Sequence, residues 1–200
     1  MRVNRAGCVL LVIDVQDRII NTIAEHEAVV QNIKTLIKAA EALNVPVLST
    51  EQEKLGETVP ELKDLIHGPP VRKVTFSCSG NAEFMKKLTE TRKKVVVVCG
   101  IETHICVLQT TLDLLEHRYR VLLARDATSS HAVLDRETAL NRMADSGATI
   151  TTTEATIYEL AEKSGTDEFR KILEIVKNNR AAQSSRPKSR VSVSVTSKKS

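Results

Sequence analysis

Two uninterrupted apolar runs limit the folds open to this chain more than any other feature of its sequence. The first covers residues 8–13, and the second, residues 95–99, reads Val-Val-Val-Val-Cys. Each run is far too short to span a membrane. Neither run alternates apolar and polar residues, as a strand with one face in water does. Such runs are typical of strands buried on both faces, in a parallel sheet covered by helices.

The remaining chain continues a pattern in which a strand is followed by a helix. Further strands are predicted at 45–48, 71–74, 119–123 and 149–151, and helices at 22–43, 60–66, 81–88, 104–117, 135–146 and 154–177. The strand at 95–99 is expected to stop at Gly100. This alternation predicts an α/β protein, a three-layer αβα fold around a mostly parallel, Rossmann-like sheet of about six strands.

Positive charge is concentrated at the C-terminal end of the chain. Residues 180–200 contain six Lys or Arg and no acid, while the whole chain carries +4, which leaves −2 for residues 1–179. The end of the chain also lacks a helical stripe of apolar residues. Residues 1–178 are therefore predicted to form the folded domain and residues 179–200 a basic, disordered tail.

The cysteine and aromatic content of the chain indicates which cellular compartment and which binding partners to expect. The four cysteines, at 8, 78, 99 and 106, form no CxxC pair, and no apolar leader precedes the first strand. Free thiols and a cytoplasmic location are expected. With no Trp, two Tyr and three Phe, the chain lacks the rings that stack on nucleic-acid bases. We expect no membrane partner and no nucleic-acid partner.

Chemically active side chains follow several of the predicted strands. Asp14 follows the first strand, Lys73 lies at the end of the third, and Cys106 follows the fourth. The carboxyl ends of parallel strands share one edge of a sheet, so these three side chains are expected to meet in one crevice. A thiol near a cation and a helix N-terminus is activated for attack, and a carboxylate can take its proton. Cys8, Cys78 and Cys99 are interpreted as packing residues.

Each of these residues also has an ordinary structural interpretation. An Asp after a strand is commonly a cap, a lone Lys is commonly solvated, and a Cys on a helix commonly packs as a small apolar residue. The spacing alone therefore leaves an enzyme and a non-catalytic protein about equally supported. The basic tail keeps open a nucleic-acid-associated protein, or one that retains the fold without turnover.

Three segments resemble the signature segments of the isochorismatase-like hydrolase superfamily. They are residues 12–16, residues 72–77, and residues 98–107, which read Val-Cys-Gly-Ile-Glu-Thr-His-Ile-Cys-Val. They occur in the order and spacing of that superfamily, and the similarity extends over about residues 5–160. The last segment is the most specific, and residues 50–52 and 58–62 are most similar to the isochorismatase-domain-containing branch.

The resemblance implies a catalytic triad. Asp14 would be the general acid and base, Lys73 its cationic partner, and Cys106 the nucleophile that forms a thioester with a small amide or related acyl compound. It further implies a cis peptide between Ile101 and Glu102, which would turn the Glu102 N–H toward the oxyanion beside the Cys106 N–H. The expected protein is a cysteine hydrolase that assembles as a homo-oligomer.

Substrate contacts are predicted at Gln16, Phe76 and Thr103. Related nicotinamidases bind a metal through Asp and His residues after the second strand. Residues 51–53 read Glu-Gln-Glu in this chain, and after the second strand no His occurs until His67. No catalytic metal and no cofactor are therefore expected.

Overall fold

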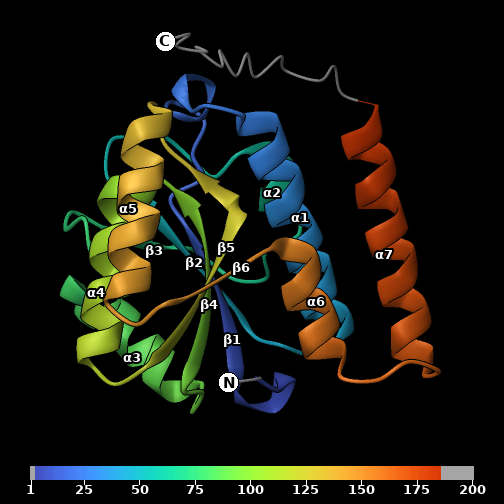
Figure 1. The fold of residues 1–200 in the computed structure, drawn as a ribbon. Coiled ribbons are helices and arrows are strands. Elements are labelled where there is room, and N and C mark those ends of the chain that lie inside the picture. Colours follow the sequence, from blue (N-terminus) through green and yellow to red (C-terminus); the bar gives the residue numbers. More distant parts are fainter. Residues whose placement is uncertain (1–2, 186–200) are drawn as a thin grey trace, which may run out of the picture.

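The computed structural model describes residues 3–185 and confirms the predicted three-layer αβα fold around a parallel sheet (Figure 1). The strands are β1 (Cys8–Ile13), β2 (Val47–Gln52), β3 (Val71–Lys73), β4 (Val95–Ile101), β5 (Arg120–Ser129) and β6 (Thr149–Thr151). They lie in the order β3-β2-β1-β4-β5-β6, and every neighbouring pair is parallel. The order reverses between β1 and β4, where such sheets bind their ligands.

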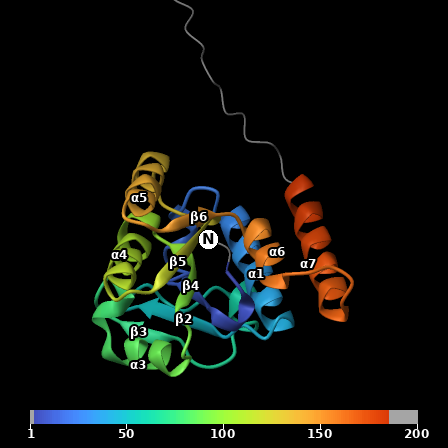
Figure 2. The same ribbon diagram turned by 60° about the horizontal axis from the view of Figure 1, so that its bottom comes forward.

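Helices cover both faces of the sheet. They are α1 (His26–Ala42), α2 (Pro60–Lys63), α3 (Ala82–Glu90), α4 (Leu108–Glu116), α5 (Val133–Asp145), α6 (Thr153–Ala161) and α7 (Asp167–Ser184). Helices α3, α4 and α5 lie on one face, and α1 and α6 lie on the other, with α7 outside them (Figures 1 and 2). Within residues 3–185, no helix is long and apolar enough to cross a membrane.

The central strand β1 is apolar throughout because both of its faces are buried. Cys8, Leu10 and Val12 point into the core beneath α1 and α6. Their alternate neighbours, residues 9, 11 and 13, point into the second core beneath α3, α4 and α5. Burying a Val, Leu or Ile side chain stabilises the fold by roughly 1.5–3 kcal/mol. The two-sided burial inferred from the sequence is confirmed.

Three strands differ from the predicted ranges in ways that affect the carboxyl edge of the sheet. β2 begins after Pro46 and continues to Gln52, and β5 continues to Ser129. β4 runs through Gly100 to Ile101, so the predicted stop at Gly100 is wrong. A Cβ at Gly100, where φ is +126°, would lie 2.1 Å from the Ile13 carbonyl oxygen. Gly100 is therefore needed for the close approach of β4 to β1, not as a terminator.

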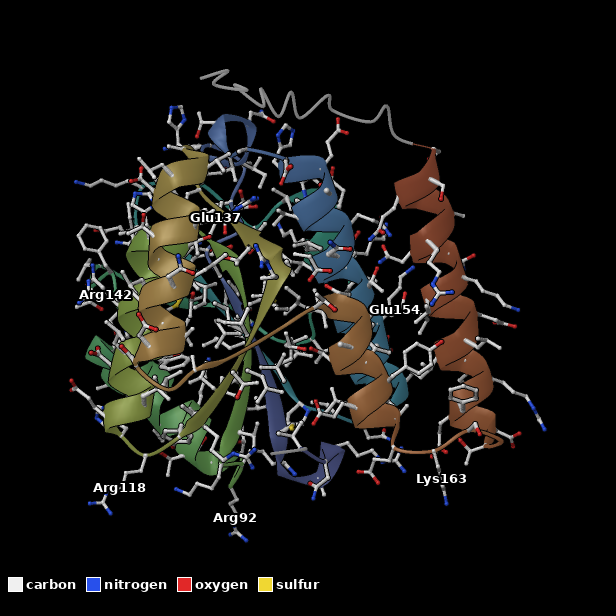
Figure 3. The ribbon with its side chains drawn as sticks, in the orientation of Figure 1. Arg92, Arg118, Glu137, Arg142, Glu154 and Lys163 are labelled. Atoms are coloured by element: carbon white, nitrogen blue, oxygen red, sulfur yellow. The ribbon has the colours of Figure 1, made fainter. Side chains whose placement is uncertain are left out.

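The boundary predicted after residue 178 is too early, because α7 continues to Ser184. The buried Asn32 of α1 accepts hydrogen bonds from Asn179 Nδ2 at 3.1 Å and from Gln183 Nε2 at 2.9 Å. Arg180 forms an ion pair with Glu154. Glu154 lies at the start of α6 (Figure 3). The sequence lacked an apolar stripe here because amide side chains, not apolar ones, hold this end of α7. The rest of the predicted tail, residues 186–200, lies outside the described residues.

A chain that ends at residue 178 is therefore expected to be less stable than one that ends at residue 185. Loss of Asn179 and Gln183 leaves the buried Asn32 carbonyl without its donors, which costs about 1–3 kcal/mol. The free energy of unfolding in urea measures the difference. Equal stability of the two chains would show that the end of α7 contributes nothing to the fold.

Candidate active site

The carboxyl ends of four neighbouring strands converge on one small site. Lys73 is the last residue of β3, Asp14 follows β1, and Cys106 lies in the turn after β4. β2 lies between β3 and β1, and it places Thr50 and Gln52 between the lysine and the aspartate. The structure thus brings the three predicted residues together at the point where strand order reverses.

Asp14 owes its position to an abrupt end of β1. Its φ of +53° lies in the left-handed region, which Asp tolerates better than most residues. Its carboxylate is buried, with Oδ1 accepting a 2.7 Å hydrogen bond from the Thr50 hydroxyl. Its Oδ2 accepts a 2.6 Å charge-assisted bond from Lys73 Nζ. Both carboxylate oxygens are therefore fixed by donors from neighbouring strands.

Lys73 is buried but fully provided with acceptors. Besides Asp14, its ammonium donates to Gln52 Oε1 at 2.7 Å and to the carbonyls of Thr75 and Phe76 at 3.2 and 3.1 Å. Burial lowers the pKa of Lys73, but opposing effects, led by the negative charge of Asp14, raise the pKa overall. The lysine thus remains charged at neutral pH, as a buried partner of Asp14.

Cys106 lies in η4 (Thr103–Val107), a π-helical turn that precedes α4, not in the first turn of an α-helix as predicted. The turn is held by residues at the end of β5. Thr103 shares a 2.8 Å hydrogen bond with Thr128, and His104 Nδ1 lies 2.9 Å from Ser130 Oγ. His104 Nδ1 is thus engaged by Ser130.

The Cys106 thiol is protonated at rest, contrary to the expected activation. Burial, together with the charge of Asp14 and its side-chain hydrogen bond to the thiol, raises the pKa of Cys106 to about 12. Lys73 acts in the opposite direction but is outweighed, because its charge is largely balanced by Asp14. Little thiolate is therefore present at neutral pH, and the Asp14 carboxylate, a group that can act as a base, is hydrogen-bonded to the thiol.

A cavity of about 300 Å³ opens onto Cys106 and Asp14. Its other lining residues are Ile19, Gln52, Glu53, Leu55, Phe76, Ile101, Glu102 and Ile105. The exposed surface of its walls is mostly apolar, and the half-exposed Phe76 ring is among them; the substrate contact at Phe76 stays a prediction. The peptide between Ile101 and Glu102, both in this lining, is cis, as the resemblance implied.

Two predicted substrate contacts do not reach this cavity. Gln16 is buried, and its amide bonds to the backbone of Gln52 and Gly56, so it holds the loop after β2. Thr103 is buried against Thr128 instead. Both predictions are wrong for the same reason: each side chain points into the protein and is satisfied there.

Gln52 and Thr50 are the site residues that the sequence prediction missed. Both belong to the last three residues of β2, at the same edge as Lys73. Ending the second strand at residue 48 left them in a loop. The rule that selected Lys73, a polar residue at the carboxyl end of a strand, would have found them had the strand been extended.

Other cysteines and metal ligands do not add a second reactive centre. Cys8, Cys78 and Cys99 are buried free thiols in the two cores, and burial raises the pKa of Cys78 to about 11. Across residues 3–185, no three His, Cys, Asp or Glu side chains gather as a metal site would require. The absence of a catalytic metal stays a prediction.

Comparisons with known proteins agree on one family. The family model described as "Isochorismatase domain" matches residues 8–155. The chain is 40% identical to the secreted isochorismatase effector Isc1 of Phytophthora sojae, over 88% of this chain and 87% of that protein. It is 36% identical to the mouse isochorismatase domain-containing protein 2A, over 88% and 85%. The solved MAR1 ribonuclease from Caenorhabditis elegans matches with a TM-score of 0.84 and 35% identity, over 88% and 93%.

Alkylation of Cys106 by iodoacetamide is expected to accelerate about tenfold per pH unit between about pH 7 and pH 10, without a plateau. Only the thiolate reacts, and burial places the pKa of the thiol near 12. Asp14→Asn should react faster at each pH, because the carboxylate raises that pKa while Lys73 lowers it. Peptide mass spectrometry over time measures both rates, with the deeply buried Cys99 as an unlabelled internal control. A wild-type plateau near neutral pH would contradict this account.

Proposed function

This chain belongs to the isochorismatase family, and we propose that it is a metal-free cysteine hydrolase of small amides or related acyl compounds. The single observation that carries the proposal is the buried Asp14–Lys73 pair, 2.6 Å between Oδ2 and Nζ, whose Asp14 lines the same cavity as Cys106. A buried charged pair in a cleft beside a nucleophilic side chain is typical of a functional site.

Acylation begins with transfer of the thiol proton of Cys106 to Asp14 as the sulfur attacks the substrate carbonyl. The carbonyl π electrons move to oxygen, and the N–H groups of Glu102 and Cys106 stabilise this oxyanion in our proposal. When the tetrahedral intermediate collapses, the C–N bond breaks and Asp14 returns its proton to the departing amine. A thioester at Cys106 and a free amine result.

Deacylation repeats these steps with water as the nucleophile. Asp14 takes a proton from water, the hydroxide adds to the thioester carbonyl, and the C–S bond breaks on collapse. The proton on Asp14 passes to the sulfur, which restores the resting thiol, and the carboxylic acid leaves. Lys73 serves both halves by keeping a positive charge beside the carboxylate that gains and loses the proton.

The dimensions and lining of the cavity support a small substrate with an apolar body. About 300 Å³ holds a small organic molecule, and Ile19, Leu55, Phe76 and Ile105 give it aliphatic and aromatic walls. The cation beneath the site, Lys73, is already engaged by Asp14 and Gln52. A neutral amide therefore suits the site better than a substrate that depends on an anionic group.

A panel of small amides tests the proposal through release of ammonia or amine. The wild-type protein should release it from at least one amide, and intact mass spectrometry should detect a transient adduct with the mass of the acyl group. Cys106→Ala should do neither, because no thioester can form. Equal release by wild type and Cys106→Ala would refute the cysteine mechanism, and no release from any amide would favour a fold that is retained without turnover.

Lys73→Met is expected to lower kcat on such an amide by about 100-fold or more, because Asp14 would lose the charge that favours its ionised form. It leaves a buried carboxylate unpaired, so unfolding should also become easier by about 3–5 kcal/mol. Measuring kcat and urea stability together separates the two effects. A stable Lys73→Met protein with unchanged kcat would exclude a catalytic role for the lysine.

Ribonuclease activity is a second candidate, favoured by the 35% identity to a protein named MAR1 ribonuclease. The cavity holds no more than a small group of an RNA chain, so cleavage would need a further surface. Incubation with a labelled single-stranded RNA tests it. Cleavage by wild type that Cys106→Ala abolishes would favour this candidate over amide hydrolysis, and intact RNA would exclude it.

Assembly and location remain predictions. Val133 and Leu134, at the start of α5, are among the most exposed large apolar side chains, at 53% and 77%. A face of this kind suits the expected homo-oligomer, and sedimentation would give its size. The cytoplasmic location is likewise an expectation, since a relative at 40% identity is named as a secreted effector.

A further inference from the structure

Thr50 makes a hydrogen bond that the proposed catalytic steps leave unexplained. Its side chain is 1% exposed, and its hydroxyl donates to Asp14 Oδ1 at 2.7 Å. The register of β1 and β2 pairs Thr50 with Ile13, and the Asp14 N–H donates to the Thr50 carbonyl at 3.2 Å. The strand pairing therefore fixes both the backbone and the carboxylate of Asp14 against one residue.

Cys78 lies behind Thr50 and continues the same chain of donors. Its thiol is fully buried, and Sγ donates to Thr50 Oγ1 at 3.8 Å. The Cys78 N–H donates to Thr110 Oγ1 at 2.9 Å, which holds the cysteine in place. Because the thiol occupies a lone pair of the Thr50 oxygen, the Thr50 proton is left to point at Asp14. The donors thus run from Cys78 through Thr50 to the carboxylate.

This arrangement matters because Asp14 must meet two requirements to act as a base. It must be ionised, and it must keep a lone pair toward the thiol of Cys106. A hydrogen bond donated to a carboxylate favours its charged form and fixes its rotation. Lys73 fixes Oδ2, but a single contact leaves the carboxylate free to turn about it. The Thr50 hydroxyl fixes the second oxygen.

We propose that Thr50 is a positioning residue for the general base Asp14, with Cys78 orienting the Thr50 hydroxyl from behind. The inference rests on the proposed cysteine hydrolase function and goes beyond it. Thr50 does not line the cavity that Cys106 and Asp14 share, and no proton passes through it. It acts by holding the carboxylate in its ionised form and in one rotation.

The test uses p-nitrophenyl acetate, a small activated acyl ester, and follows acetylation of Cys106 by intact mass and by p-nitrophenol release. Thr50→Val keeps the shape of the side chain and removes only the hydroxyl. It should slow acetylation by about tenfold. Its profile of rate against pH should also differ from that of the wild type, because the hydroxyl no longer donates to the base. Thr50→Ser, which keeps the hydroxyl, should restore both within about threefold.

Thr111 provides a matched control for the Thr50 substitution. It is a buried threonine of α4 whose hydroxyl makes no hydrogen bond within the described residues. Thr111→Val should leave the acetylation rate and its pH profile unchanged. Cys78→Ala should shift both in the direction of Thr50→Val but by less, and Cys78→Ser should retain them because a hydroxyl also donates.

The outcomes separate this inference from the function on which it rests. An unchanged pH profile and rate in a folded Thr50→Val protein would overturn the role of Thr50 while leaving the hydrolase intact. Equal slowing by Thr50→Val, Thr50→Ser and Thr111→Val would show a packing effect and would overturn it as well. If wild type and Cys106→Ala acquire the acetyl group equally, the proposed function itself is wrong, and the inference falls with it.

Discussion

The ion pair between Asp14 and Lys73 is the interaction on which the rest of the site depends. It joins the ends of β1 and β3 across β2 at 2.6 Å, with both side chains almost inaccessible to water. Two buried charges cost several kcal/mol each in desolvation, which is offset only when every polar atom finds a partner. Thr50 and Gln52 supply those partners from the intervening strand. The sheet topology thus creates both the pair and its support.

The pair also explains why the nucleophile rests as a thiol. A lysine alone would favour a thiolate at Cys106, but Asp14 balances the lysine charge and lies against the sulfur. Burial and the carboxylate together raise the pKa of Cys106 to about 12. The thiol is then inert toward most solutes, and in the proposed mechanism it becomes a nucleophile when the base takes its proton in the transition state. This arrangement keeps a cysteine that lines an open cavity from reacting with solutes.

The sequence predicts the fold and the three central residues because both follow from strand patterning. The apolar runs at 8–13 and 95–99 belong to β1 and β4, and the residues after them face the crevice. Prediction failed where polar side chains are satisfied internally. Gln16 resembles a substrate contact in sequence but holds backbone, and α7 is fixed by amides that carry no apolar stripe. The raised pKa of Cys106 was also out of reach, because it depends on three-dimensional charge balance.

Coupling between Asp14 and Lys73 gives the most direct test of the claim that they act as one unit with Cys106. The rate of Cys106 acetylation should be measured in Asp14→Asn, in Lys73→Met and in the protein that carries both changes. Residues that act as a unit give non-additive losses, so the double variant should be no slower than the slower single variant. Losses that multiply in the double variant would mean that the two residues act independently, and the account of the site would be wrong.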